Sequence, residues 1–212
     1  MFDKPYNPLE KKNLAASVSE ALLMRPISLL PQVEPFEGAG IYALYYVGHF
    51  PLYESMAKRN IAGQFELPIY VGKAVPAGSR KGGYRFHEAP GRVLYRRLCE
   101  HAETIRQAEN LDINDFFCRY LVVDDIWIPL GEALLIELFY PVWNMVIDGF
   151  GNHDPGSGRY SGKRSRWDTM HPGRAWANKL KDNSETVEQI SDKVKDIRRN
   201  TKSEGGQFSS TI

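Results

Sequence analysis

The sequence is short of cysteine and of long apolar runs, and each shortage excludes a class of protein. The 212 residues include two cysteines, Cys99 and Cys118, which are too few for a disulfide framework or a four-ligand zinc site. No apolar run approaches the roughly 20 residues that a membrane helix needs. The first residues, Met1 to Pro5, form neither the basic nor the apolar region of a signal peptide. We therefore expect a cytoplasmic protein without a membrane partner.

Net charge is also nearly absent, but the charges are segregated along the chain. The 27 basic and 26 acidic residues give a net charge of +1, which by itself disfavours a nucleic-acid binder, because such proteins usually carry a basic excess. Residues 73–106 have eight basic against three acidic residues, 107–148 one against eight, and 156–181 seven against one. Two basic segments thus flank an acidic one, and the total excludes only a uniformly basic protein that coats DNA.

The apolar pattern predicts a small α/β domain. Hydrophobic residues make up 42% of the chain, which is enough for a buried core. Runs of β-branched and aromatic residues predict three strands, at 40–47, 68–72 and 116–123. Helical spacing of apolar residues predicts helices, at 8–25, 93–109, 129–140 and 184–200. The first strands lie too close together for parallel crossovers, so we expect an α/β (α+β) fold with a small mixed, mostly antiparallel three-stranded sheet flanked by helices.

Composition divides the chain into three parts. We expect an N-terminal helical extension over 1–35, a core over 36–148, and a basic loop with a C-terminal helix and tail over 149–212. Within the core, residues 48–67 and 74–92 are too long for hairpin turns and are predicted to be insertions. Residues 148–173 contain six glycines and are predicted to form a long loop.

Four short motifs contain the side chains best able to carry chemistry. They are Gly40-Ile41-Tyr42, Tyr70-Val71-Gly72, Arg97-Leu98-Cys99-Glu100-His101, and Glu132 with Pro141-Val142-Trp143-Asn144. Each has an ordinary structural interpretation. Tyrosines are common in strands, an arginine and a histidine four apart share a helix face that is usually solvated, and glutamate or asparagine near helix ends often serves the helix itself. Only their combination can indicate a function.

In combination, the four motifs resemble the GIY-YIG nuclease superfamily. The first motif matches the family signature letter for letter, and the second matches it with Val71 in place of isoleucine. In the family's last helix, a catalytic glutamate precedes an isoleucine by four residues and an asparagine by twelve. Glu132 has this spacing to Ile136 and to Asn144, whereas Glu137 on the same predicted helix does not. The resemblance covers roughly residues 38–148.

The resemblance implies a nuclease with one divalent metal ion, Mg²⁺, at each active site. Glu132 would be the protein ligand of that ion, and Arg97 would bind the scissile phosphate. Tyr42 would position or deprotonate the attacking water. A free phenol has a pKa of about 10, too high for an efficient base at neutral pH, so His101 is the candidate for accepting its proton. Tyr70 would share this network, and the remaining member of the catalytic set, Asn144, would brace the helix end or the metal-bound waters.

The enlarged loops resemble the type II restriction endonuclease branch, although His101 stands where many members of the superfamily have tyrosine. This implies cleavage of double-stranded DNA at a GC-rich palindrome such as CCGCGG, and a cognate methyltransferase that makes no direct contact. Candidate DNA contacts are the basic residues of the long loops, Lys73, Arg80, Lys81, Arg85, Arg159, Lys163, Arg164 and Arg166. Lys73 is equally well interpreted as a surface lysine.

Cutting both strands of a palindrome with one active site per chain calls for a homodimer. The apolar stripe at 184–199 or the N-terminal helix could supply part of the interface. Packing of either segment on its own core is an equally good interpretation.

Two other functions are consistent with the motifs. One is a homing or repair nuclease of the same superfamily, but homing enzymes usually carry a separate DNA-binding tail, and the short polar tail gives no sign of one. The other is a non-catalytic DNA- or RNA-binding module. The joint presence of Tyr42, Tyr70, Arg97 and Glu132 disfavours it, because a binding module does not need the full set.

Overall fold

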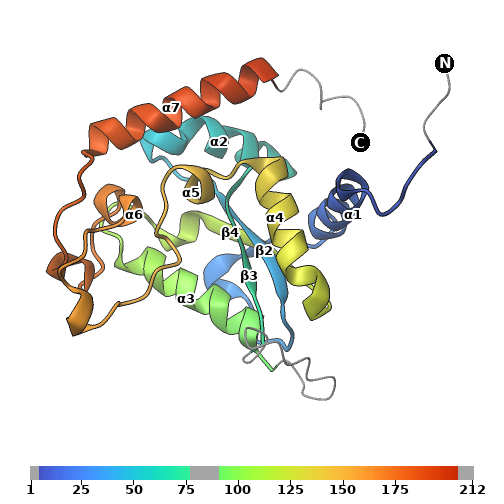
Figure 1. Ribbon diagram of the computed structural model, residues 1–212, viewed down its shortest axis with the longest axis horizontal. Helices are drawn as coiled ribbons and strands as arrows, with labels where there is room; N and C mark the ends of the chain where they lie inside the picture. Colours follow the sequence, from blue (N-terminus) through green and yellow to red (C-terminus); the bar gives the residue numbers. More distant parts are fainter. Residues whose placement is uncertain (1–4, 77–90, 205–212) are drawn as a thin grey trace.

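A computed structural model describes residues 5–76 and 91–204, and its centre is a four-stranded sheet between two layers of helices (Figure 1). The strand order is β1-β4-β2-β3, with β1 Ser28–Leu29, β2 Gly40–Tyr46, β3 Pro68–Ala74 and β4 Phe116–Val122. The predicted α/β class and three of the strands are confirmed. All pairings among these four strands are antiparallel, so the mixed sheet was an incorrect detail of the prediction.

The sheet has one more strand than the sequence predicts. β1 has two residues and pairs with β4, with Ser28 opposite Cys118. It lies between Pro26 and Pro31, and two residues cannot display the alternation that reveals a strand. Its pairing with β4, and not its own sequence, makes it a strand.

β2 lies inside the sheet and is buried along its whole length. Tyr42 and its even-numbered neighbours face one core, whereas Ile41 and its odd-numbered neighbours face the other. A strand that is covered on both faces reads as a continuous apolar run, as this one does. Consequently, the hydroxyl group of Tyr42 lies inside the protein.

Helices cover both faces of the sheet (Figure 1). One face is covered by α1 Lys11–Leu23 and α4 Ile128–Phe139. The other face is covered by α2 Glu54–Arg59, α3 Val93–Gln107, α5 Val142–Met145, α6 Arg166–Met170 and α7 Val187–Glu204. The four predicted helices are confirmed with shifted ends. None of the helices in the described part of the chain is long and apolar enough to cross a membrane.

The apolar stripe of α7 packs on the chain's own core. Ile190 and Val194 are at most 1% exposed and belong to the same hydrophobic cluster as the buried residues of α3. Leu22 of α1 is likewise fully buried, in the other cluster. The sequence left two interpretations of these helices, a dimer interface and packing on the chain's own core. Packing on the core accounts for these three residues.

The insertion at 48–67 has local structure, as predicted. A 3-10 turn at Pro51–Tyr53 leads into α2 and then into a π-helical turn at Asn60–Gln64. The buried side chain of Asn60 fixes the insertion: its Nδ2 donates to the carbonyl oxygens of Tyr46 (3.1 Å) and Leu67 (3.0 Å). Most of the other predicted insertion, 77–90, lies outside the described residues.

The predicted loop at 148–173 is only partly a loop, because it contains α6. Ser165 caps this short helix, and its hydroxyl accepts a hydrogen bond from the backbone N–H of Asp168 at 3.1 Å. A serine followed by an acidic residue three positions later is a helix-start signal. The many glycines of this segment nevertheless led to the prediction of a loop.

We expect Gly40→Ala to weaken the pairing of β2 with β4. A Cβ atom at Gly40 would lie 2.0 Å from the backbone oxygen of Leu121, so a strand must shift, at a cost of about 1–3 kcal/mol in the free energy of unfolding. At Gly158 a Cβ atom would meet no described atom within 4 Å, so Gly158→Ala should stay within about 0.5 kcal/mol of the wild type. Urea unfolding measures both variants, and equal effects would contradict the close approach at Gly40.

Candidate active site

A buried hydrogen bond joins β2 to α3 at the centre of the site. The hydroxyl oxygen of Tyr42 and Nε2 of His101 are 2.5 Å apart, and both side chains are at most 1% exposed. Gly72 lies opposite Tyr42 in the sheet, and a Cβ atom there would be 2.3 Å from the same hydroxyl oxygen. The glycine that ends the second tyrosine motif thus makes room for the tyrosine of the first.

Burial determines the ionisation of both groups. The pKa of Tyr42 lies well above its usual value of 10.0, first because of burial and then because of Tyr70. The pKa of His101 lies well below 6.5, first because of burial and then because of the charge on Arg97. Both side chains are therefore neutral at pH 7. A neutral imidazole with its proton on Nδ1 accepts the phenolic hydrogen bond at Nε2.

Two more aromatic rings enclose this pair. The ring of Tyr70 lies 5.3 Å from that of His101, centroid to centroid, and 6.2 Å from that of Tyr42. Phe150 stacks on the His101 imidazole at 4.4 Å with an interplanar angle of 14°. Phe150 also meets Tyr70 edge to face at 4.9 Å. These contacts fix the plane of the imidazole.

Arg97 lies one turn before His101 on α3, and its guanidinium group is held from two sides. Nη1 donates to Oε2 of Glu100 at 2.8 Å and lies 2.9 Å from Nε2 of His153. Nη2 donates to the backbone oxygen of Gly151 at 3.2 Å. An oriented guanidinium group can bind two oxygens of a phosphate at once.

Glu132 brings a carboxylate to the same site from α4. Its Oε2 lies 2.5 Å from Nζ of Lys73 on β3. The carboxylate raises the pKa of Tyr42 and of Tyr70 as a lesser cause than burial, so it lies within electrostatic reach of both phenols. Glu137 is exposed and points to another face of the helix, roughly one and a half turns farther on.

The residues present fit one hard cation. Among the described residues, no group of three or more histidines, cysteines, aspartates or glutamates could hold a metal ion together. Glu132 is partly exposed, with 20% of its side chain accessible, so it can be a single carboxylate ligand while waters complete the shell. Mg²⁺ commonly binds in this way because it dehydrates reluctantly.

Asn144 holds the edge strand in place. Its Oδ1 accepts a hydrogen bond from the backbone N–H of Val71, and its Nδ2 donates to the Val71 carbonyl, both at 2.8 Å. β3 is at the edge of the sheet, so this amide replaces a missing strand partner. The side chain therefore braces the strand between Tyr70 and Gly72, and not the helix end.

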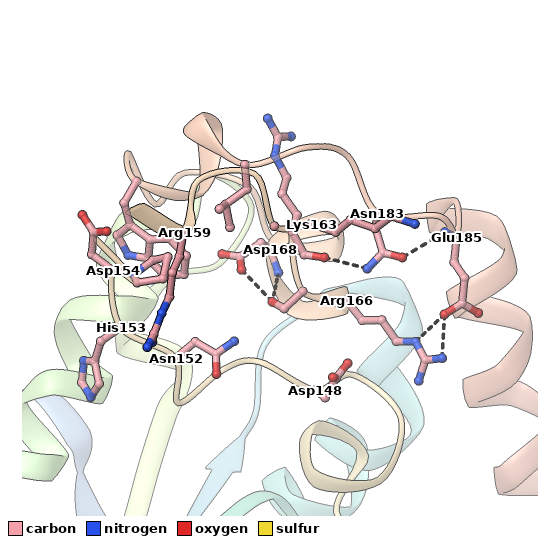
Figure 2. A pocket seen from close by; sticks show the side chains of 16 residues that line it. Asp148, Asn152, His153, Asp154, Arg159, Lys163, Arg166, Asp168, Asn183 and Glu185 are labelled. Atoms are coloured by element: carbon pink, nitrogen blue, oxygen red, sulfur yellow. Dashed lines mark hydrogen bonds and ion pairs between the residues drawn. The ribbon is translucent and has the colours of Figure 1, made fainter. Parts of the chain in front are cut away.

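The predicted DNA contacts have three different outcomes. Three of them, Arg80, Lys81 and Arg85, lie outside the described residues. Lys73 is paired with Glu132, as above. The other four line a cavity of about 820 Å³ (Figure 2), namely Arg159, Lys163, Arg164 and Arg166.

Two of these four basic cavity residues have partners within the chain. Arg166 binds Glu185 with Nε at 2.6 Å from Oε2, and Arg164 donates to the backbone oxygen of Ala177 at 3.0 Å. Arg159 and Lys163 are exposed, and the described part of the chain offers their side chains no hydrogen bond or ion pair. These two are the ones available to a ligand.

Sequence reasoning missed a buried ion pair beside this cavity. Asp168 and Arg174 are 3% and 2% exposed, and Oδ1 of Asp168 lies 2.6 Å from Nε of Arg174. In the sequence both residues belong to a strongly basic segment that suggests a solvated surface. The one available signal was the pair of tryptophans, Trp167 and Trp176, on either side of the arginine.

The chain matches a known family over most of its length. Residues 34–198, which are 165 of the 212, match a family model described as the Eco29kI GIY-YIG domain. The matched range includes β2, β3, α3 and α4, the elements that carry the residues described above. No curated protein matches the chain.

The chain contains a second buried histidine besides His101. His171 lies with Nε2 2.6 Å from the hydroxyl of Tyr53 and Nδ1 2.9 Å from Oδ1 of Asn110. Burial lowers the pKa of His171 to about 3. In the unfolded chain both histidines bind a proton near pH 6.5. The unfolded state therefore holds more protons below that pH, and acid favours unfolding.

We expect the free energy of unfolding to fall as the pH drops below about 6.5, by up to about 1.4 kcal/mol per pH unit for each buried histidine. His101→Gln and His171→Gln should each make this fall less steep. His49→Gln, a histidine substitution at an exposed position, is the control. Urea unfolding at a series of pH values measures the slopes. An unchanged slope in His101→Gln would show that His101 is not held neutral in the folded protein.

Proposed function

The chain belongs to the Eco29kI branch of the GIY-YIG nuclease family, and on that premise we propose that it is a type II restriction endonuclease. It would hydrolyse both strands of double-stranded DNA, with Mg²⁺, at a GC-rich palindrome such as CCGCGG. The observation that carries this proposal is the buried hydrogen bond between Tyr42 and His101, with the Glu132 carboxylate near enough to raise the pKa of Tyr42. A fold that only bound DNA would not need a buried proton-accepting pair near a partly exposed carboxylate.

Tyr42 and His101 would provide the proton path. As water attacks the phosphorus, the Tyr42 hydroxyl takes the proton of the water and passes its own to Nε2 of His101, 2.5 Å away. A lone buried phenolate would be costly, because burial raises the pKa of Tyr42. A neutral imidazole in direct contact removes the need for that phenolate.

Arg97 and Glu132 would act on the charges of the phosphate. Arg97 presents a guanidinium group that is already oriented by Glu100 and Gly151, so little freedom is lost when it binds the phosphate. Glu132 would hold Mg²⁺, which when bound supplies neutralisation of the leaving oxygen. Lys73 would then turn from Glu132 toward a phosphate of the DNA.

The cavities beside the site support a path for the duplex. One cavity, of about 510 Å³, is lined by Arg97 and His101. The cavity of about 820 Å³ in Figure 2 carries Arg159 and Lys163, and both cavities share residues 152–154. A duplex lying across them would meet basic side chains beside the catalytic ones. Two strands and one site per chain call for a homodimer, and a separate methyltransferase would protect the host DNA.

Cleavage of a plasmid that contains CCGCGG, with Mg²⁺ or with EDTA, tests the proposal. We expect discrete fragments with Mg²⁺ and intact plasmid with EDTA. Glu132→Gln should cut at least about 100-fold more slowly, because it removes the metal ligand. Glu137→Gln, an exposed change on the same helix, should cut like the wild type. Random nicking, no cutting by the wild type, or full activity of Glu132→Gln would overturn the assignment.

Arg159 and Lys163, whose side chains have no hydrogen bond or ion pair with the described residues, should contribute to affinity for DNA. We expect Arg159→Gln and Lys163→Gln each to lower the slope of log affinity against log salt concentration by about 0.9, the value for one lost phosphate contact. Lys12→Gln is the control. Lys12 pairs with Glu10 and lies on α1, which covers the face of the sheet opposite the one covered by α3 and α6. Fluorescence anisotropy with a labelled duplex gives the slopes, and equal slopes in all three variants would place the DNA elsewhere.

A further inference from the structure

Arg174 is buried and fully oriented behind the active site. Its Nε donates to Oδ1 of Asp168 at 2.6 Å, and the other carboxylate oxygen accepts the Ser165 hydroxyl at 2.6 Å. The guanidinium group lies over the rings of Trp167 and Trp176, 4.6 Å from each centroid. A buried charge with this many partners has little freedom to turn.

The remaining donors of Arg174 all bind one short segment of backbone. Nη1 donates to the carbonyl oxygens of Phe150 (3.3 Å) and Asn152 (3.0 Å), and Nη2 donates to that of Gly149 (3.0 Å). Gly149 has a φ of 100°. Because glycine has no Cβ atom and adopts many backbone conformations, this residue does not hold the segment rigid by itself. The planar guanidinium group therefore acts as a template for the segment, which the three donors of a lysine on a flexible stem cannot reproduce.

The same segment touches two catalytic side chains. The carbonyl oxygen of Gly151 accepts from Nη2 of Arg97 at 3.2 Å, and Nε2 of His153 lies 2.9 Å from Nη1. The ring of Phe150 stacks on the His101 imidazole at 4.4 Å. Phe150 thus lies between Arg174 and His101, the group that would accept the proton. The adjacent residues Asn152 and His153 lie between Arg174 and Arg97, the group that would bind the phosphate.

We propose that Arg174 is a positioning residue: by fixing residues 149–153 it sets the orientation of Arg97 and His101 for the nuclease reaction. The proposal rests on the proposed function. Arg174 belongs to the basic segment 156–181, which also carries Arg159 and Lys163. The contact therefore links the surface that would meet DNA to the catalytic side chains.

Arg174→Lys tests this role because it keeps the positive charge and removes the planar set of donors. We expect the single-turnover cleavage rate to fall about 100-fold, as for a misplacement of catalytic groups by about 1 Å. The Kd for the same duplex, measured without Mg²⁺, should change by less than about threefold, since no proposed DNA contact is removed. Rates and Kd values are compared below the unfolding temperature of every variant.

Arg119→Lys is the matched control. Arg119 also donates to two carbonyl oxygens, those of Arg25 (3.0 Å) and Phe65 (2.7 Å), and lies over the ring of Tyr45. It is on β4, away from residues 149–153. This variant should lose stability and keep the wild-type cleavage rate. An equal loss of rate in both variants, or a loss in Arg174→Lys that merely follows weaker DNA binding, would overturn the proposal.

A second readout does not need activity. If the wild type cuts no DNA, the proposed function fails, and the pKa of His101, followed by ¹⁵N NMR of the imidazole, decides whether Arg174 orders the site. The titratable and charged groups that face His101 all keep their charge in Arg174→Lys; they are Tyr42, Tyr70, Arg97, His153 and residue 174. The proposal predicts a rise in that pKa, because release of Phe150 would let water reach His101, whose burial is the first cause of its low pKa; an unchanged pKa would contradict the proposal.

Discussion

The hydrogen bond between Tyr42 and His101 is the interaction on which the rest of the site depends. Burying a polar group costs free energy of folding unless the group forms a hydrogen bond. Here the two buried groups form that hydrogen bond with each other. That requirement places the tyrosine on the strand buried on both faces and the histidine on the inner face of α3. It also leaves only a glycine at position 72. A neutral phenol beside a neutral imidazole is thus a consequence of the packing.

The charged residues of the site have the opposite environment. Arg97, Glu132 and Lys73 are partly exposed, so they can reach a phosphate or a cation, while the Tyr42 and His101 side chains are buried. The segment 149–153 lies between these two zones and is held by Arg174. The near-zero net charge conceals this arrangement, because the acidic segment supplies Glu132 and the basic segments supply cavity residues such as Arg97 and Arg159.

Sequence reasoning predicted the parts whose signal is local. Long aromatic and β-branched runs predicted β2, β3 and β4, which the structure confirms. The order of four motifs selected Tyr42, His101 and Glu132 as candidates, and the structure brings the first two into contact. It failed where tertiary contacts decide. The two residues of β1 become a strand only by pairing with β4, and Asn144 binds Val71, which lies 73 positions earlier. Apart from the two nearby tryptophans, nothing in the sequence distinguishes Arg174 from a solvated arginine; its burial depends on the tertiary contacts with Asp168 and those rings.

The central claim is that a neutral His101 accepts the proton that Tyr42 passes on. The most direct test is the single-turnover rate of DNA cleavage at saturating enzyme and Mg²⁺, between about pH 5 and pH 8, a range that brackets the ordinary histidine pKa. Because the pKa of His101 lies well below 6.5, the account predicts no histidine-dependent loss of rate as the pH falls through that value. A rate that falls about tenfold per pH unit below about 6.5 would contradict it.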